Sequence, residues 1–411
     1  MTKKIDQRLP KDSGATKLPS YAAIKSPWER MYGFRDAMRY ITRYEAVFGA
    51  AILQGIRILI PDYEDRAQTI CQAAFDRMYA TSQKYGVTQE YLLNMHPFMC
   101  GEFVGALIGD EGDDGMLMPG RVQDFGTYRC EKELDACPWD IIGSELCRAT
   151  TMSLQSQARG SAERHRQGPT LDYAMVEARG CGDRHCRIVA ENREKYPMPE
   201  HALWQSFGPI ATADQIKCTP EEECVEDPMV FREECGFKFA NGTNLEEGSE
   251  MAAMVQFATS SCLYFFPTLT RAIDEGRLEE KTVLHVLKCV LEAAGKAAFG
   301  EPYARLAARE WLGVPVEAPW DGRIMGGHIE MMLQALMCAY EVEAFNKDEV
   351  ILVIDRKGLE ISNGWMQTPC HIAYWNGMVK TLVSPQWFVF EEGSTDKQIR
   401  VRIAKKIDKF C

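Results

Sequence analysis

The sequence predicts an α+β protein made of two tandem copies, each a helical front half followed by a small antiparallel sheet with a helix. Three observations support this: long stretches with apolar residues at helical spacing, short alternating stretches around Gly turns, and the repetition of that order. A chain of 411 residues also suits two domains better than one core. The expected parts are an N-terminal extension (1–27), a first repeat (28–211), an acidic linker (212–248) and a second, diverged repeat (249–411).

The first repeat begins with three expected helices. Residues 28–61 carry apolar residues at helical spacing and stop at Pro61, residues 63–86 close at Gly86, and residues 88–109 are interrupted near Pro97. These segments form the helical front half.

Extended segments follow in the first repeat. We expect an extended stretch over 121–132, a helix over 144–165, and two paired strands in LDYAMVEAR and HCRIVAEN around the turn Gly-Cys-Gly-Asp at 180–183.

The second repeat shows the same order after a Glu- and Asp-rich segment with little apolar periodicity. Three helical stretches (250–276, 280–300 and 302–313) precede an alternating strand, EVILVIDR, and a helix, CHIAYWNGMVKTLV. Two strands then flank Gly-Ser-Thr-Asp at 393–396. In each copy a cysteine begins the helix that leads to the Gly-Asp turn, but GCGDRHCRIV is answered by GSTDKQIRVRI, without its cysteines.

The composition excludes several classes of protein. A net charge of −12 and no cluster of Lys and Arg argue against a nucleic-acid or membrane-surface partner. No apolar run approaches a membrane span, and the N-terminus lacks a secretory core, so we expect a cytoplasmic protein. Its 15 cysteines should then be mostly free thiols that favour thiol or metal chemistry. A small-molecule substrate is the expected partner, and a homo-oligomer remains open.

Two cysteines are candidate nucleophiles. Cys147 follows Gly-Ser-Glu at the expected start of a helix, where the dipole and free N–H groups stabilise a thiolate. Cys370 has the same placement and is followed by His371, a candidate base. The alternative is that both cysteines are half-buried spacers between helix and sheet.

Polar residues near these cysteines supply further candidates. Acid or base roles are assigned to His165, Glu177 and Asp183, and substrate-binding roles to Arg148, Arg179, Tyr374 and Asn376. For Asp183 the structural alternative is strong, because an aspartate after Gly in a hairpin turn hydrogen-bonds its own backbone.

The hairpin itself is a candidate metal site. Cys181 and Cys186 could supply two thiolates to zinc, with Cys130, Cys137, Cys147 or His165 completing a tetrahedral site. His185 and Cys186 are neighbours on a strand and point to opposite faces, so both could not easily bind one ion. Buried cysteines acting as small apolar residues are the alternative.

Several of these motifs resemble those of a known protein family. CPWDIIGSELC (137–147), a helix, and a strand leading to GCGDRHCRIV (180–189) resemble the L-2-amino-thiazoline-4-carboxylic acid hydrolase family. The second half is similar more weakly: Gly364 and Trp365 stand in place of Cys-Pro, Cys370 matches Cys147, and Ile399 or a neighbour replaces the last cysteine.

The same hairpin is similar to that of vinyl-4-reductase-type sensor domains, which bind small aromatic or hydrophobic ligands and in some members hold zinc through cysteines. Cys186 matches a ligand cysteine, whereas Ala178 stands where another cysteine would be expected.

The hydrolase resemblance implies opening of a small cyclic amidine, lactam or related heterocycle at a C–N bond. Such a reaction suits a cysteine thiolate, because the carbon between two heteroatoms is electrophilic, and it requires no cofactor, although zinc is compatible with the cysteines. The alternatives are a non-catalytic, sensor-like protein that binds a small molecule, and a metal or thiol protein.

Overall fold

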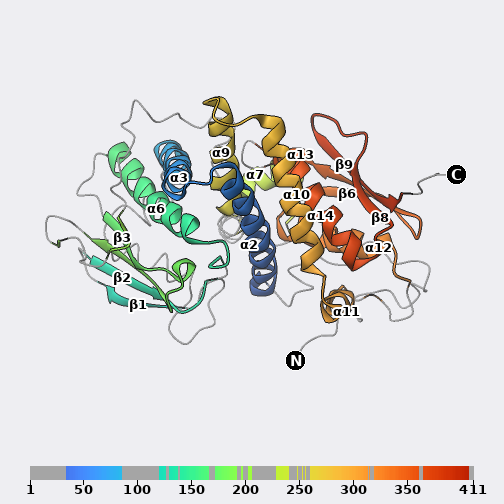
Figure 1. Ribbon diagram of the computed structural model, residues 1–411, viewed down its shortest axis with the longest axis horizontal. Helices are drawn as coiled ribbons and strands as arrows, with labels where there is room; N and C mark the ends of the chain where they lie inside the picture. Colours follow the sequence, from blue (N-terminus) through green and yellow to red (C-terminus); the bar gives the residue numbers. More distant parts are fainter. Residues whose placement is uncertain are drawn as a thin grey trace. The chain divides into compact units, whose positions relative to one another are not determined.

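The structure is a computed structural model that divides into two compact units (Figure 1). The N-terminal unit comprises Thr42–Glu226 and Thr259–Glu279, and the C-terminal unit comprises Met1–Ile41, Asp227–Ala258 and Glu280–Cys411. The residues described are 34–85, 120–125, 129–137, 139–165, 172–191, 196–197, 202–205, 228–239, 248, 252, 255, 260–312, 314, 319–360 and 364–406. The expected extension (1–27) and the expected helix over 88–109 lie outside them.

The described helices of the first repeat are α2 (Phe34–Leu59), α3 (Tyr63–Tyr85) and α6 (Ser144–His165). Helices α3 and α6 belong to the N-terminal unit, and α2 belongs to it from Thr42 onward. Asp62 caps α3 because its Oδ1 accepts a hydrogen bond from the backbone N–H of Asp65 at 2.8 Å. Helices α3 and α6 pack against each other along much of their length. The predicted bounds 63–86 and 144–165 are confirmed almost to the residue.

The N-terminal sheet has five antiparallel strands in the order β1-β2-β4-β3-β5. Its strands are β1 (Gly120–Phe125), β2 (Arg129–Leu134), β3 (Asp172–Glu177), β4 (Cys186–Glu191) and β5 (Trp204–Gln205). The stretch 121–132 that we expected to be extended is therefore two strands that pair with each other. The later hairpin, β3 with β4, is confirmed.

Helix α9 (Ser260–Asp274) belongs to the N-terminal unit, although the sequence division assigns it to the second repeat. The Tyr264 hydroxyl donates to Ser153 Oγ at 2.9 Å, and Arg271 pairs with Asp76 at 2.8 Å. These polar contacts join α9 to α6 and α3. They explain why α9 belongs to the N-terminal unit, although the expected boundary lies at 249.

The C-terminal unit contains α10 (Glu280–Ala298), α11 (Pro302–Trp311), α12 (Gly322–Ala335), α13 (Arg356–Leu359) and α14 (Gln367–Leu382). Helix α12 was not expected. Every one of its residues is buried, so its sequence lacks the polar face that makes a helix visible as a periodic pattern. Within α12, His328 and Glu330 are buried in the core.

Part of the segment expected to be a linker is folded. Helix α7 (Pro228–Glu234) lies within 212–248 and belongs to the C-terminal unit. Its Arg232 is fully buried and donates to the carbonyl oxygen of Gly358 at 3.1 Å. Because this core residue is charged, the composition of the segment did not indicate a buried helix.

The C-terminal sheet has the order β6-β7-β9-β8 and repeats the first four strands of the N-terminal sheet. Its strands are β6 (Tyr340–Phe345), β7 (Glu349–Asp355), β8 (Trp387–Glu391) and β9 (Gln398–Lys405). The predicted α+β class with two tandem halves is thus confirmed, with β6 as a strand that the sequence did not indicate.

A β-bulge fixes which residues of the two copies correspond. The register shifts between Val122 and Asp124 in β1, and between Val342 and Ala344 in β6. Lys132 and Leu352 face these bulges in β2 and β7, and they pair onward with Ile188 in β4 and Val401 in β9. By this register Asp135 corresponds to Asp355, His185 to Gln398 and Cys186 to Ile399.

Helices α10 and α14 pack in the C-terminal unit as α3 and α6 do in the N-terminal unit. Two glycines permit a close approach: a Cβ at Gly295 would collide with the backbone of α14, and one at Gly377 would collide with the backbone of α10.

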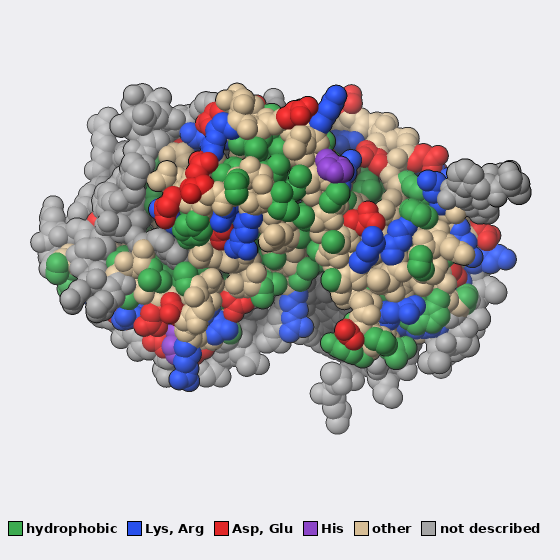
Figure 2. Space-filling view, in the orientation of Figure 1, with side chains coloured by type: hydrophobic (Ala, Val, Ile, Leu, Met, Phe, Trp, Pro, Cys, Tyr) green, Lys and Arg blue, Asp and Glu red, His purple; other side chains and the backbone are tan. Residues whose placement is uncertain are grey.

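The surface in view mixes both signs of charge. Among the described residues in Figure 2, Lys and Arg side chains are interspersed with Asp and Glu. No helix in the described part of the chain is long and apolar enough to span a membrane.

Candidate functional site: a thiol cluster at the first hairpin

The turn between β3 and β4 has a defined geometry. Arg179–Cys181 form one turn of 3-10 helix, and Gly182 follows in the left-handed region with φ of 96°. Asp183 Oδ2 accepts a hydrogen bond from the backbone N–H of Ala178 at 2.9 Å. Asp183 therefore closes the turn, which is the structural role that turn chemistry indicates; its predicted acid/base role stays a prediction.

Arg179 fastens this turn to the loop before α6. Its guanidinium contacts Asp140 Oδ2 at 2.9 and 3.0 Å, and it donates to the carbonyl oxygens of Asp135 at 3.1 Å and Arg184 at 2.7 Å. These contacts engage the guanidinium and make Arg179 a structural link between the turn and the loop; its predicted substrate-binding role stays a prediction.

Gly180 brings the turn against α6. A Cβ at this position would lie 2.7 Å from Cys147 Sγ and 3.2 Å from the backbone of Gly143. Only glycine permits so close an approach, so the turn and the start of α6 form one packed corner.

The described cysteines near this corner are Cys137, Cys147, Cys181 and Cys186, and we call them the thiol cluster. The thiols of Cys137 and Cys186 are hydrogen-bonded to each other, and Cys147 is close enough to feel charge on Cys186 and Cys181. Cys186 is buried, Cys137 and Cys147 are half-buried, and Cys181 is exposed. The cluster therefore extends from the core of the unit to solvent.

The thiols of the cluster differ in acidity. The Cys137 hydrogen bond lowers the pKa of Cys186, and the N–H of Arg179, which donates to Cys186 Sγ at 3.3 Å, lowers it further. The same pairing raises the pKa of Cys137. Burial raises the pKa of Cys147 to about 12. Cys186 is thus the sulfur that loses its proton first among these three.

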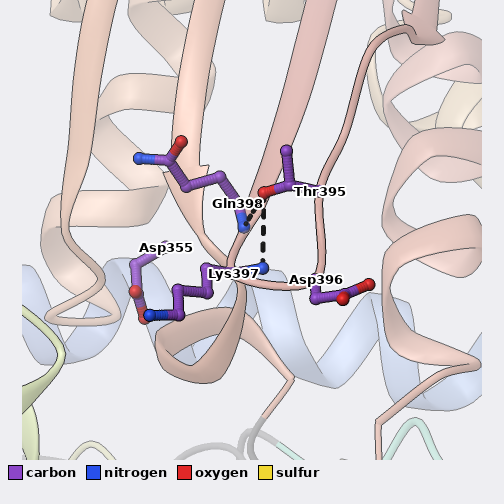
Figure 3. A pocket seen from close by; sticks show the side chains of 5 residues that line it. All are labelled: Asp355, Thr395, Asp396, Lys397 and Gln398. Atoms are coloured by element: carbon purple, nitrogen blue, oxygen red, sulfur yellow. Dashed lines mark hydrogen bonds between the residues drawn. The ribbon is translucent and has the colours of Figure 1, made fainter.

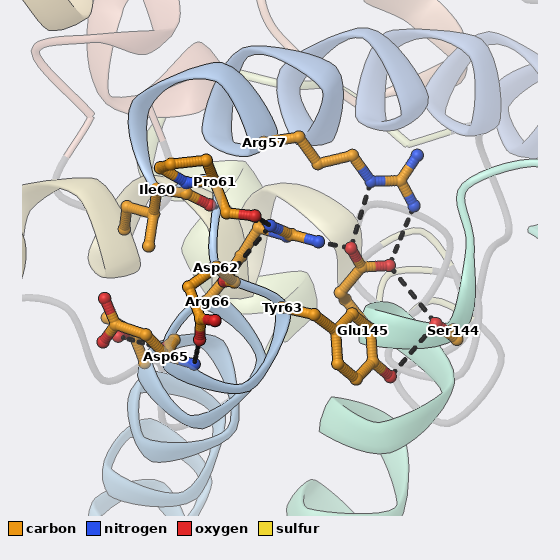
Figure 4. Close-up of polar contacts among 10 residues, drawn as sticks. Arg57, Ile60, Pro61, Asp62, Tyr63, Asp65, Arg66, Ser144 and Glu145 are labelled. Atoms are coloured by element: carbon orange, nitrogen blue, oxygen red, sulfur yellow. Dashed lines mark hydrogen bonds and ion pairs between the residues drawn. The ribbon is translucent and has the colours of Figure 1, made fainter.

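Glu145, two residues before Cys147 along the chain, is held by two arginines (Figure 4). Its carboxylate accepts from Arg57 at 2.8 and 3.0 Å and from Arg66 at 2.9 Å. Burial alone would raise the pKa of Glu145, but the Arg57 hydrogen bond and those from its own backbone and Arg66 lower it to about 2. Glu145 is therefore an ionised anchor that ties α2, α3 and α6 together beneath the cluster.

The other predicted residues of the first copy lie around the cluster without converging on it. Arg148 pairs with Glu64 at 2.9 Å, and Glu177 lies 3.6 Å from Arg187. His165 is the last residue of α6, and its side chain lies outside the described residues. No contact described here joins Arg148 or Glu177 to a thiol of the cluster.

The predicted residues of the second copy lie inside the core of the C-terminal unit. Helix α14 begins at Gln367, so Cys370 is its fourth residue and its N–H already bonds to the carbonyl of Met366 at 3.2 Å. Cys147 is likewise the fourth residue of α6. Cys370 is fully buried, and burial raises its pKa. Both cysteines therefore lie near the start of their helices, at the end of the first turn, and Cys370 has no exposed surface there.

The neighbours of Cys370 are equally enclosed. His371 is 2% exposed, packs on the Trp375 ring, and has its pKa lowered to about 3 by burial. Tyr374 is buried, and Asn376 Oδ1 accepts from the N–H of Val389 at 3.2 Å. These residues act as core in the structure, and their predicted catalytic or binding roles stay predictions.

A depression of about 580 Å³ lies at the second hairpin (Figure 3). It is lined by Asp355 and by the turn residues Thr395–Gln398, where Thr395 Oγ1 accepts from the N–H groups of Lys397 and Gln398 at 3.3 and 3.1 Å. By the shared register this is the corner that corresponds to the first hairpin. It is polar and carries no thiol.

The structure also brings together a group that sequence reasoning did not assemble. Glu133, Asp135 and His185 each place a ligand atom within 4.8 Å of the other two. Residues 133 and 135 are two positions apart, so alternation along β2 predicts that their side chains point to the same face of the sheet. That His185 lies beside them follows only from the pairing of Leu134 with Cys186, which the sequence does not give.

Comparison with protein-family models, with curated proteins and with solved structures finds no match.

Proposed function

We propose that the protein is a hydrolase that opens a small cyclic amidine, lactam or related heterocycle at a C–N bond, with the thiol cluster as its reactive site. The reaction type rests on the family resemblance of the sequence. The observation that carries the site is the position of Cys186 Sγ, which accepts from the Arg179 N–H at 3.3 Å beside the Cys137 thiol; this pairing lowers the pKa of Cys186 and raises that of Cys137. The Cys186 thiolate can then act as the nucleophile, and the Cys137 thiol can act as the acid.

The chemistry follows from that pair. The Cys186 thiolate adds to the ring carbon between two heteroatoms, the C–N bond breaks, and the departing nitrogen takes the proton of Cys137. Water then attacks the Cys186-bound carbon and releases the opened product. The proton lost by water returns the Cys137 thiol, and both sulfurs are restored. This proposal replaces Cys147 and Cys370, the nucleophiles expected from the sequence, by Cys186. Burial raises the pKa of Cys147 and of Cys370, whereas hydrogen bonds from Cys137 and from the Arg179 N–H lower the pKa of Cys186.

Access to the site comes from the exposed side of the turn. Cys181 is exposed, and Cys137 and Cys147 are half-buried, so we expect a small ring to approach the buried Cys186 from this side. The Arg179 backbone N–H at 3.3 Å from Cys186 Sγ keeps the thiolate oriented toward the turn.

The test begins with a thermal-shift screen of cyclic amidines, lactams and cyclic ketones, followed by ring opening measured by ultraviolet absorbance. A ligand at 100 times its dissociation constant should stabilise the protein by about 2.7 kcal/mol. Turnover should rise with pH through an inflection below the ordinary thiol pKa of about 8.5, because the reactive form is the thiolate.

Two variants sharpen that test. Cys137→Ala should move the inflection to higher pH and reduce kcat by about 10²- to 10⁴-fold, because Cys186 loses its hydrogen-bond donor and the nitrogen loses its acid. Cys289→Ala, an exposed cysteine of α10, is the matched control and should change neither. Binding without turnover in the unchanged protein would instead favour the sensor-like alternative.

A zinc site at the same cluster is the second candidate. Cysteines 137, 147, 181 and 186 are the four thiolates that a closed tetrahedral zinc site requires, and backbone N–H groups of Arg179 and Gly180 reach the sulfurs of Cys186 and Cys147. Among the described residues, no three of these sulfurs lie within 4.8 Å of one another, so zinc would have to draw them together. Elemental analysis after anaerobic purification decides: stoichiometric zinc that is lost in Cys186→Ser favours this candidate, and a metal-free protein that turns over ends it.

A further inference from the structure

The outer face of the N-terminal sheet carries three convergent ligand atoms. His185 Nδ1 lies 3.1 Å from Asp135 Oδ1 and 3.6 Å from Glu133 Oε1. Two ligands bound to one transition-metal ion at about 2.0 to 2.2 Å are separated by about 3.0 to 3.5 Å, depending on the angle between them. The two distances from Nδ1 are therefore close to those between ligands of a single ion, and the two carboxylate oxygens lie within 4.8 Å of each other.

The imidazole nitrogen at the centre of this group faces two carboxylate oxygens. His185 Nδ1 is shielded from solvent, and its contacts with Asp135 and Glu133 are at ion-pair distances but are not aligned as hydrogen bonds. A metal ion between the three atoms would accept the lone pair of Nδ1 and offset the charge of both carboxylates. A proton on Nδ1 is the competing occupant, and it would give a plain ion pair.

We propose that Glu133, Asp135 and His185 bind a divalent first-row metal ion of the zinc and manganese class. One imidazole nitrogen and two carboxylate oxygens suit these ions, and Asp135 is 44% exposed, so water can complete the coordination. The ion would join the end of β2 to the start of β4, at the outer side of the corner where the thiol cluster lies.

This site is separate from the thiol cluster. Successive side chains of a strand point to opposite faces, so His185 and Cys186 lie on opposite sides of the sheet. Burial agrees, because Cys186 is 4% exposed whereas His185 is half-buried on the outer face. The second copy keeps only the aspartate of the group, with Val353, Asp355 and Gln398 at the three corresponding positions.

The experiment is a titration of the full chain with Co²⁺, followed by visible and near-ultraviolet absorption. We expect one equivalent bound through nitrogen and oxygen, with weak visible bands and no sulfur-to-cobalt charge-transfer band, and the same spectrum in Cys186→Ser. A cobalt site made of thiolates would instead show the charge-transfer band and lose it in Cys186→Ser.

Two variants and one control test the ligands. His185→Gln and Asp135→Asn should each weaken Co²⁺ binding at least about tenfold, since loss of even an outer partner of a ligand commonly costs about 10- to 100-fold. Glu131→Gln removes the same charge from the same face of β2 but leaves the group intact, and it should bind as the unchanged protein does. Absence of Co²⁺ binding, or binding by His185→Gln equal to that by Glu131→Gln, would overturn the proposal.

Discussion

The two hairpin corners share a backbone but differ in chemistry. In the N-terminal unit the turn after β3 carries Cys181, His185 and Cys186, and it faces Asp135 at the end of β2. In the C-terminal unit the register places Gln398 and Ile399 at the positions of His185 and Cys186. Strand order, bulge and helix pairing are retained, so the fold does not depend on the thiols or the histidine. These residues are therefore specific to the first copy, which favours a function located there.

The start of the helix beside each corner differs in the same sense. Glu145 in α6 is ionised between two arginines, and the corresponding position of α14 holds Thr368, whose hydroxyl donates to Glu360 at 2.5 Å. The fourth residue is half-buried in α6 (Cys147) and fully buried in α14 (Cys370). The first copy therefore has a buried carboxylate and a half-buried cysteine where the second has a hydroxyl group and a fully buried cysteine.

The largest difference that we expect between the copies is in thiol accessibility. Iodoacetamide should label exposed Cys181 in the native protein, whereas Cys370, with no exposed surface, should be labelled only after unfolding and at least about 10³-fold more slowly. Peptide mapping by mass spectrometry over a time course measures both rates together. Labelling of Cys370 at the rate of Cys181 would show that the second corner is open as well.

The buried carboxylate of the first copy should have a large effect on stability. Glu145→Gln leaves Arg66 buried without its charged partner and should lower the free energy of unfolding by about 3 to 5 kcal/mol, measured by chemical denaturation. Glu64→Gln removes a carboxylate that is 64% exposed and should cost at most about 1 kcal/mol. Equal losses from the two variants would contradict the anchoring role of Glu145.

The same residue predicts an acid sensitivity. Because the pKa of Glu145 is lowered to about 2 in the folded protein, its contribution is present above its unfolded pKa of about 4.3 and is lost as the pH falls toward 2. We expect about 3 kcal/mol of unfolding free energy to be lost over this range, and Glu145→Gln should flatten that part of the pH profile. Identical profiles for the two proteins would place the acid-sensitive group elsewhere.

The tight corner predicts a smaller effect. Gly180→Ala would place a methyl group 2.7 Å from Cys147 Sγ, and the resulting overpacking should cost about 1 to 3 kcal/mol of unfolding free energy. Gly300→Ala meets no atom closer than 3.4 Å and serves as the control, with an expected change below about 0.5 kcal/mol. A neutral Gly180→Ala would mean that the turn and α6 are not tightly packed.

The sequence predicted those elements whose residues face both core and solvent. Helices α3, α6 and α10 and the hairpin strands have this amphipathic pattern, and their positions agree closely with expectation. Helix α12 is buried on every side, so its sequence has no polar face that would reveal a helical period. Helix α7 lies in a segment rich in charged residues, and its buried residue Arg232 is itself charged, so the composition indicated a linker. The exchange of α9 into the N-terminal unit depends on tertiary contacts, which no local pattern records.

The site was predictable only in part for the same reason. Cysteines 137, 147, 181 and 186 could be singled out by type and spacing, but their acidities depend on which sulfur lies beside which donor. Glu133 and Asp135 became candidates only through the register of β2 with β4. Cys370 matched Cys147 in position along its helix, yet burial, which the repeat pattern does not report, separates the two.

The most direct test of the location of the chemistry compares one cysteine from each copy. The rate of ring opening, as kcat/KM, should be measured for Cys186→Ser and Cys370→Ser with the substrate that the screen identifies, after both variants are shown to be folded. We predict a loss on the order of 10²-fold or more for Cys186→Ser and a change below about threefold for Cys370→Ser. The opposite pattern, with Cys370→Ser inactive and Cys186→Ser unaffected, would place the active site in the second copy and contradict this account.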